Sequence, residues 1–199
     1  MVANIHIKQQ KRRIVSQKEC ETDLKLVLPL FFQAFYEAVE LFKKEIGLTP
    51  PTARVRNYEA TLLNSKILQC VQKYFPDNWC FGKYKRFILR LNGYRVLVKK
   101  LNKYNKPMNV KTKNTVAIGN QMQLSLFEDE DVSDPVLFFG YRINSIGEII
   151  SPKLVFIDED QVKWQITMDD IVETPILPII SEEGSADVSL RKGRKAVNN

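Results

Sequence analysis

The dipeptide Asn92-Gly93 constrains the fold of this chain more than any other feature of its sequence. It lies between KRFILRL and YRVLVKKL, two runs in which side chains alternate with a period of two. Asn and Gly both tolerate the positive φ that a two-residue turn requires, so the sequence predicts a β-hairpin over residues 85–101. One face of this hairpin is apolar, and the other carries a set of cationic side chains: Arg86, Arg90, Arg95 and Lys99.

The N-terminal part of the chain has helical periodicity instead. Apolar side chains recur every three or four positions in residues 21–46 and again in 56–74, which predicts two helices joined by a short proline-containing connection. Pro29 cannot donate a backbone hydrogen bond, so it marks either a kink or the first turn of the first helix. A helix-turn-helix DNA reader is the alternative interpretation, but the first helix is too long and too apolar for it.

Strand periodicity returns after Asp134-Pro135. Three apolar runs separated by short turns predict a β-meander over residues 136–168. The predicted fold is therefore α+β, with an N-terminal helical hairpin packed on a mainly antiparallel β-sheet. The expected core consists of Phe31, Phe35, Leu63, Ile67, Phe87, Leu89, Val96, Phe138, Leu154 and Trp164.

A chain of 199 residues favours one domain, which we place at residues 19–180. Residues 1–18 are polar and basic and predict a flexible arm, and residues 181–199 predict a disordered basic tail. Residues 102–135 join the hairpin to the meander, first basic and then acidic, and are expected to form an irregular linker.

Several classes of function are disfavoured by composition. No run of about 18 uncharged apolar residues occurs, and the first residues lack the apolar core of a secretory signal, so we expect a cytoplasmic protein without membrane contact. Three cysteines without CxxC spacing and a single histidine, His6, argue against structural disulfides, a zinc site and histidine chemistry. We therefore predict no cofactor, no metal site and no catalytic residue.

Charge is segregated along the chain. Residues 78–127 contain eleven Lys and Arg but no Asp or Glu, and an acidic cluster follows at 128–134. Such segregation indicates a positive surface that meets an anionic partner, although outward cations also keep sheet edges from aggregating. The predicted contact residues are Arg86, Arg90, Arg95, Lys99, Lys100 and Lys103, with Tyr84, Tyr94 and Tyr104 available for stacking. Nucleic acid and an acidic protein both fit.

The acidic stretch IDEDQVKW has two interpretations. Asp158, Glu159 and Lys163, together with Asp160, have the residue types of a metal-dependent nuclease. Their spacing fits a β-turn with a lysine returning on the next strand equally well.

A second short motif, QLSLF at residues 123–127, resembles the pentapeptide by which bacterial proteins bind the sliding clamp. The resemblance implies that Gln123 hydrogen-bonds at the rim of the clamp pocket and Leu124 contacts its surface. Leu126 and Phe127 would fill the pocket as apolar anchors. The alternative is a short strand packed on the chain's own sheet.

A wider resemblance covers about residues 80–170. The succession RFILRLNGYRVLVKKLN, KPMNVKT, VLFFGYRINSIGEIISPKL and VKWQI is similar to an uncharacterised group of small bacterial proteins. Members of this group are encoded beside regulators or predicted metalloproteases in toxin–antitoxin-like and phage-defence loci. The resemblance implies a two-component role, in a toxin–antitoxin or phage-defence system with a cognate protein partner. Together with the absence of a catalytic motif, it leads us to predict a non-catalytic binding component, with the metal-dependent nuclease as the alternative.

Overall fold

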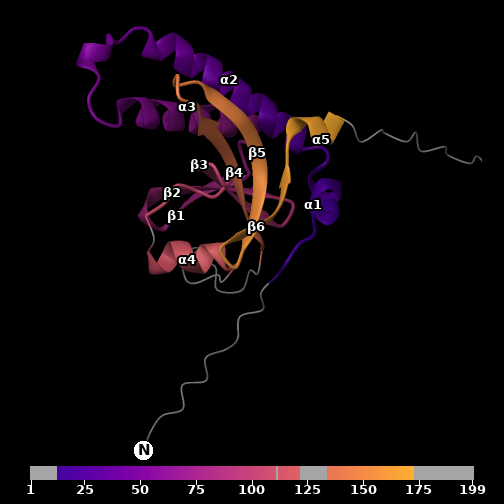
Figure 1. Cartoon of the computed structure of the whole chain (residues 1–199). Coiled ribbons are helices and arrows are strands. Elements are labelled where there is room, and N and C mark those ends of the chain that lie inside the picture. Colours follow the sequence, from indigo (N-terminus) through magenta and orange to yellow (C-terminus); the bar gives the residue numbers. More distant parts are fainter. Residues whose placement is uncertain (1–12, 111, 122–133, 173–199) are drawn as a thin grey trace, which may run out of the picture.

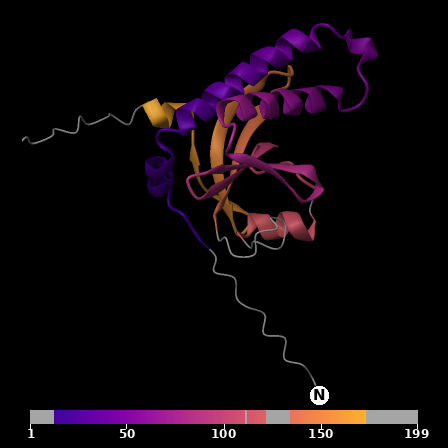
Figure 2. The ribbon, with the colours of Figure 1, turned by 180° about the vertical axis from the view of Figure 1, so that it is seen from behind.

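The computed structural model describes residues 13–110, 112–121 and 134–172, and these form three layers (Figure 1). A helical hairpin covers one face of a six-stranded sheet, and a short helix, α4, covers the other. The view from behind in Figure 2 shows the same arrangement. The predicted α+β fold is confirmed.

The helical layer differs from the prediction at its start. The expected helix at 21–46 is two helices, α1 (Gln17–Leu24) and α2 (Leu28–Ile46), because the helix is interrupted at residues 25–27. Pro29 lies in the first turn of α2, where its missing N–H leaves no helical hydrogen bond unmade. A short 3-10 turn, η1 (Pro51–Ala53), then leads to α3 (Tyr58–Tyr74), which completes the predicted hairpin with α2.

The main core lies between this hairpin and the sheet. The rings of Phe31, Phe32 and Phe35 on α2 pack on Phe139, with centroid distances of 4.3, 5.1 and 5.3 Å. All the predicted core residues are buried except Trp164, which is half-buried and stacks on Phe156. One of them, Phe138, belongs to a smaller core on the opposite face of the sheet.

The sheet has the order β1-β2-β3-β4-β5-β6. Neighbouring strands pair antiparallel except β3 and β4, which are parallel. The predicted hairpin is confirmed, since Asn92 and Gly93 have φ of 46° and 81°. The strand bounds are β1 (Trp79–Gly82), β2 (Arg86–Leu91), β3 (Tyr94–Lys100), β4 (Val136–Ile143), β5 (Ile149–Asp158) and β6 (Gln161–Ile166), with η2 (Lys83–Lys85) between β1 and β2.

The parallel pairing of β3 with β4 explains what the sequence analysis missed in the linker. A parallel pair cannot be joined by a tight turn, so the chain must cross over between the two strands. The crossover contains α4 (Lys113–Gly119), which Thr112 begins with a capping box to Thr115. The expectation of an irregular linker at 102–135 is therefore wrong for this stretch.

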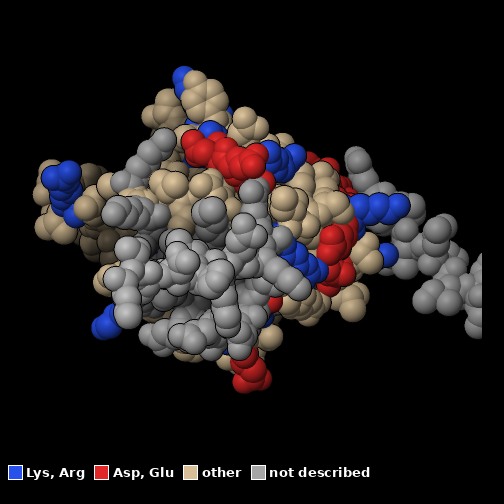
Figure 3. Space-filling model, turned by 90° about the horizontal axis from the view of Figure 1, so that it is seen from below, with Lys and Arg blue, Asp and Glu red and all other residues tan. Residues whose placement is uncertain are grey.

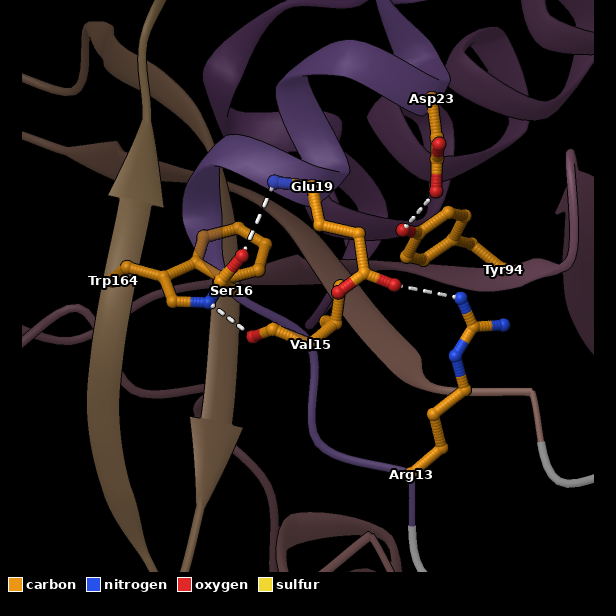
Figure 4. Close-up of polar contacts among 7 residues, drawn as sticks. All are labelled: Arg13, Val15, Ser16, Glu19, Asp23, Tyr94 and Trp164. Atoms are coloured by element: carbon orange, nitrogen blue, oxygen red, sulfur yellow. Dashed lines mark hydrogen bonds and ion pairs between the residues drawn. The ribbon is translucent and has the colours of Figure 1, made fainter.

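Residues 13–18 belong to the fold, although the sequence analysis placed them in a flexible arm. Val15 is buried, and its carbonyl accepts a 2.8 Å hydrogen bond from Trp164 Nε1 on β6 (Figure 4). In the same view Arg13 Nη2 lies 2.9 Å from Glu19 Oε1, and the Tyr94 hydroxyl donates to Asp23 Oδ2 at 2.7 Å. These contacts attach α1 to the sheet at both β3 and β6.

Residues 1–12, and the tail predicted at 181–199, lie outside the described residues. A last helix, α5 (Met168–Val172), follows β6.

Candidate functional site

Four of the predicted cations of β2 and β3 lie on the face of the sheet that α4 covers, here called the α4 face: Arg86, Arg90, Arg95 and Lys99. Lys100, at the end of β3, alternates to the other face. The α4 face is not purely charged. Ile88 and Leu97 alternate with the cations and are buried in the smaller core, which also contains Leu101, Ile118, Val136, Phe138, Val155 and Ile157. On β2 and β3 the α4 face therefore alternates between apolar and cationic side chains.

Arg95 corrects the sequence analysis most clearly. It was predicted to be an exposed contact residue, but its side chain is almost completely buried, at 1% exposure. The reason is that β3 is not an edge strand: β4 pairs with it, and Asp134, just before β4, places Oδ2 3.5 Å from Arg95 Nε. A buried guanidinium beside Asp134 has a structural role and cannot contact a partner.

Gln121, at the end of α4, has a related structural role that the sequence analysis missed. Its buried Nε2 donates to the carbonyls of Val136 and Ile157 at 3.0 and 2.8 Å, and its Oε1 accepts from Val136 N at 2.8 Å. The side chain thus attaches the crossover to β4 and β5.

The other predicted contact residues are accessible. Arg90, Lys100 and Lys103 are exposed, and Arg86 and Lys99 are half-buried. Of the three tyrosines predicted to stack, Tyr84 and Tyr104 are 76% and 65% exposed, and Lys103 Nζ lies 5.0 Å from the Tyr104 ring centroid. Tyr94 is not available, because it is buried and donates to Asp23. Burial and this hydrogen bond raise the pKa of Tyr94.

Several cations on the helical hairpin are paired with carboxylates. On the helical hairpin, ion pairs join Lys43 to Glu40, Arg54 to Glu59, Lys66 to Glu45 and Lys73 to Glu37. Within the described part of the chain, no ion pair is found for Arg86, Lys99, Lys100 or Lys103. Among the described residues, the charges of these four cations are therefore not compensated by a carboxylate within ion-pair distance.

One further cation of the sheet, Lys153, was not anticipated. Lys99 lies beside Gly140 on β4, and Gly140 lies beside Lys153 on β5. Lys153 is buried and donates to Gln165 Oε1 at 3.3 Å, and its pKa is lowered by burial and by nearby Arg142. Lys153 is a single cation within the run IISPKLVFI, a signal that is present in the sequence. Only the strand register shows that Lys153 extends the row begun by Lys99.

The acidic stretch forms a hairpin turn. Asp158 pairs with Gln161 across β5 and β6, and Glu159 and Asp160 between them have φ of 51° and 56°. Lys163 Nζ lies 3.6 Å from Glu159 Oε2. Among the residues that the structure describes, no group of three potential metal ligands is found. The geometry is that of the β-turn, the second of the two interpretations.

From below, Figure 3 shows Lys and Arg interspersed with Asp and Glu around the grey residues.

The clamp-type peptide lies outside the described residues. Gln123, Leu124, Leu126 and Phe127 therefore remain a prediction from the sequence. A pull-down with purified clamp tests it: Leu126→Ala with Phe127→Ala abolishes binding if the motif docks, and leaves binding unchanged if it does not.

No protein-family model, curated protein or solved structure matches this chain. The described helices include none long and apolar enough to cross a membrane. The functional conclusion therefore depends on the surface itself.

Proposed function

We propose that this protein is a non-catalytic binding protein that contacts the phosphate backbone of nucleic acid through the accessible cations of β2, β3 and the loop that follows: Arg86, Arg90, Lys99, Lys100 and Lys103. The observation that carries the proposal is the contrast in charge pairing. Lys43, Lys66 and Lys73 on the helical hairpin have carboxylate partners, whereas Arg86, Lys99, Lys100 and Lys103 have no ion pair among the described residues. Unpaired cations gathered on one part of a fold suit an anionic partner.

Exposed aromatic rings favour nucleic acid over an acidic protein. Tyr84 and Tyr104 are exposed within the same segment as the cations, and Lys103 lies over the Tyr104 ring. Aromatic rings beside cations allow bases to stack while the cations hold the backbone, an arrangement typical of single-strand binding. An acidic protein would use the cations but has no comparable use for the rings.

The test measures binding of fluorescently labelled oligonucleotides, single-stranded and duplex, by anisotropy at several salt concentrations. If phosphate contacts dominate, log K falls linearly with log salt, with a slope of roughly −0.9 per phosphate neutralised on duplex and −0.7 on a single strand. Arg90→Glu with Lys100→Glu should weaken binding to all sequences alike, because phosphate contacts do not read bases.

The matched control reverses two charges on the helical hairpin, Lys43→Glu with Lys44→Glu, where both lysines are exposed on α2. It changes the net charge by the same amount and should leave affinity close to that of the wild type. Equal losses in both double variants would mean that only total charge matters. Absence of oligonucleotide binding at low salt would contradict the proposal and favour an acidic protein as the partner of this cationic surface.

The wider resemblance supports a bacterial two-component setting for this binding role, in a toxin–antitoxin or phage-defence locus. The neighbouring gene tests that part separately. A regulator or metalloprotease beside it favours the two-component setting, and unrelated neighbours in several genomes count against it.

A further inference from the structure

Strands β2 and β3 separate at one end of their ladder. Their ladder begins beside the turn, where Leu91 pairs with Tyr94, and its last pair is Leu89 with Val96. Past Leu89 and Val96, residues 86–88 pair only with β1 and residues 97–100 only with β4. The two strands therefore diverge, and α3 lies over the opening.

A pocket of about 270 Å³ lies in this opening. We call it the wedge pocket. It is lined by residues 84–87 and 97–99 of the diverging segments and by Asn64 and Leu68 of α3. Its charged side chains are all cationic: Lys85, Arg86 and Lys99. None of the described residues that line it carries a carboxylate, and Asn64 adds an amide that can donate to an anion.

The cations of the wedge pocket are held close together at a cost. The pKa of Lys99 is lowered, first by burial and then by the positive charge of Arg86. The Nη1 atom of Arg86 is buried and has no hydrogen-bond partner in the described structure. A buried donor without an acceptor is unfavourable, and so are two neighbouring like charges. An oxyanion between Arg86 and Lys99 would relieve both effects at once, because it accepts hydrogen bonds and carries the opposite charge.

We infer that the wedge pocket is a phosphate-binding site, in which Arg86 and Lys99 hold a phosphate group and Asn64 donates to one of its oxygens. The inference rests on the proposed function only in naming the nucleic-acid backbone as the source of the phosphate. A free phosphorylated small molecule presents the same chemistry. The remaining exposed cations, Arg90, Lys100 and Lys103, then extend the contact outside the pocket.

The test is calorimetric titration of the full chain with inorganic phosphate in chloride buffer at constant ionic strength. We expect saturable binding at one site, weakened about tenfold or more by Arg86→Gln and by Lys99→Gln, since each removes a charge-assisted hydrogen bond. Arg86→Lys, which keeps the charge, should retain part of the affinity. The control Lys43→Gln removes one positive charge from α2 and should bind phosphate as the wild type does.

Thermal unfolding in phosphate-free buffer provides a second readout. Lys99→Gln should unfold at the same temperature as the wild type or higher, because it relieves repulsion with Arg86, and phosphate should no longer raise that temperature. A binding site separates these two effects, whereas a purely structural lysine would lower the unfolding temperature in both buffers. Phosphate affinity that is unchanged in both Gln variants, or no saturable binding to the wild type, overturns the inference.

Oligonucleotide binding measured in the same variants separates the two sources of phosphate. Loss of oligonucleotide affinity in Arg86→Gln and Lys99→Gln, in parallel with phosphate, supports the backbone as the ligand. Phosphate binding without oligonucleotide binding supports the pocket, assigns it to a free phosphorylated molecule and refutes the proposed function. Oligonucleotide binding that is indifferent to both Gln substitutions overturns the assignment of the pocket to the backbone.

Discussion

Gly140 on β4 is in contact with Leu101, the residue that follows β3. A Cβ at position 140 would lie 2.3–2.6 Å from the Cγ and Cδ atoms of Leu101, which is itself buried. The Leu101 backbone N–H also donates to Tyr141 O at 2.8 Å, so the leucine cannot withdraw freely. Only glycine allows the crossover to leave β3 this close to β4.

Gly140→Ala should therefore destabilise the fold by about 1–3 kcal/mol, the usual cost of overpacking a core. The free energy of unfolding in urea measures it. Gly119→Ala is the control, since nothing lies within 4 Å of the added methyl, and it should be neutral or slightly stabilising at the end of α4. If the two variants prove equally stable, the close contact between Leu101 and Gly140 is not real.

Tyr141, the next residue, makes stability depend on pH. Burial raises the pKa of Tyr141 to about 12, whereas a tyrosine in the unfolded chain titrates near 10. The folded state thus keeps the proton longer than the unfolded state does, and the stabilisation is complete below pH 10. It is lost as the pH rises from 10 to 12.

In Tyr141→Phe this component of the pH dependence is absent. We expect wild type and variant to lose stability at different rates above pH 10, with a difference on the order of 2 kcal/mol by pH 12. Urea unfolding from pH 8 to 12 measures it. Parallel curves would show that the hydroxyl of Tyr141 is solvated in the folded protein.

For single residues, the sequence could predict the face of the strand on which a side chain lies, but not which other residues surround it. The alternation around Arg95 and Tyr94 correctly assigned them to opposite faces of a strand. It could not show that the carboxylate of Asp134, just before β4, would lie beside Arg95, or that the Tyr94 hydroxyl would donate to Asp23 of α1. Both facts depend on residues far away in the chain, which local periodicity does not report.

The elements that were predicted correctly are those with strong local signals. Asn92-Gly93 determines its own turn, and the apolar stripe of α2 determines its buried face. The missed elements, β1, α4 and α5, are four, seven and five residues long. Elements that short have too few residues for a period to be recognised, and they are stabilised mainly by tertiary contacts.

One tertiary contact attaches the residue Val15, just before α1, to β6. Trp164 Nε1 donates to the Val15 carbonyl, while the ring stacks on Phe156 at a centroid distance of 5.3 Å. Trp164→Phe keeps the stacking and removes the donor, and it should cost about 1 kcal/mol. Because the loss is local, hydrogen exchange should accelerate in α1 more than in β4 and β5.

The comparison for this experiment is Trp79→Phe on β1, where the ring stacks on Phe87 and lies on the opposite edge strand from β6. It should lower global stability without a selective effect on α1. A uniform rise in exchange in both variants would mean that α1 does not unfold independently of the sheet.

Across the whole molecule, the two faces of the sheet differ in the helices that cover them and in the side chains that they carry. One face is covered by α2 and α3 and holds the large apolar core, whereas α4 covers a small core on the other face (Figure 1). Arg86 and Lys99 lie on this second face and have no ion pair among the described residues. The sequence predicted the fold class because hydrophobic periodicity determines which layers form. It could not predict the parallel β3–β4 pairing, the divergence of β2 from β3 or the wedge pocket, since all three are produced by non-local strand pairing.

The measurement that tests nucleic-acid binding most directly is a map of backbone-amide chemical shifts as an oligonucleotide is titrated into the labelled full chain at low salt. We predict the largest changes at residues 84–90 and 97–104, which contain Arg86, Lys99, Lys100, Lys103 and the exposed tyrosines. Little change is expected on α2 and α3, where Lys43, Lys66 and Lys73 are paired with glutamates. The changes should reverse when salt is added. Shifts concentrated on α2 and α3, or no shifts at any salt concentration, would contradict the proposal.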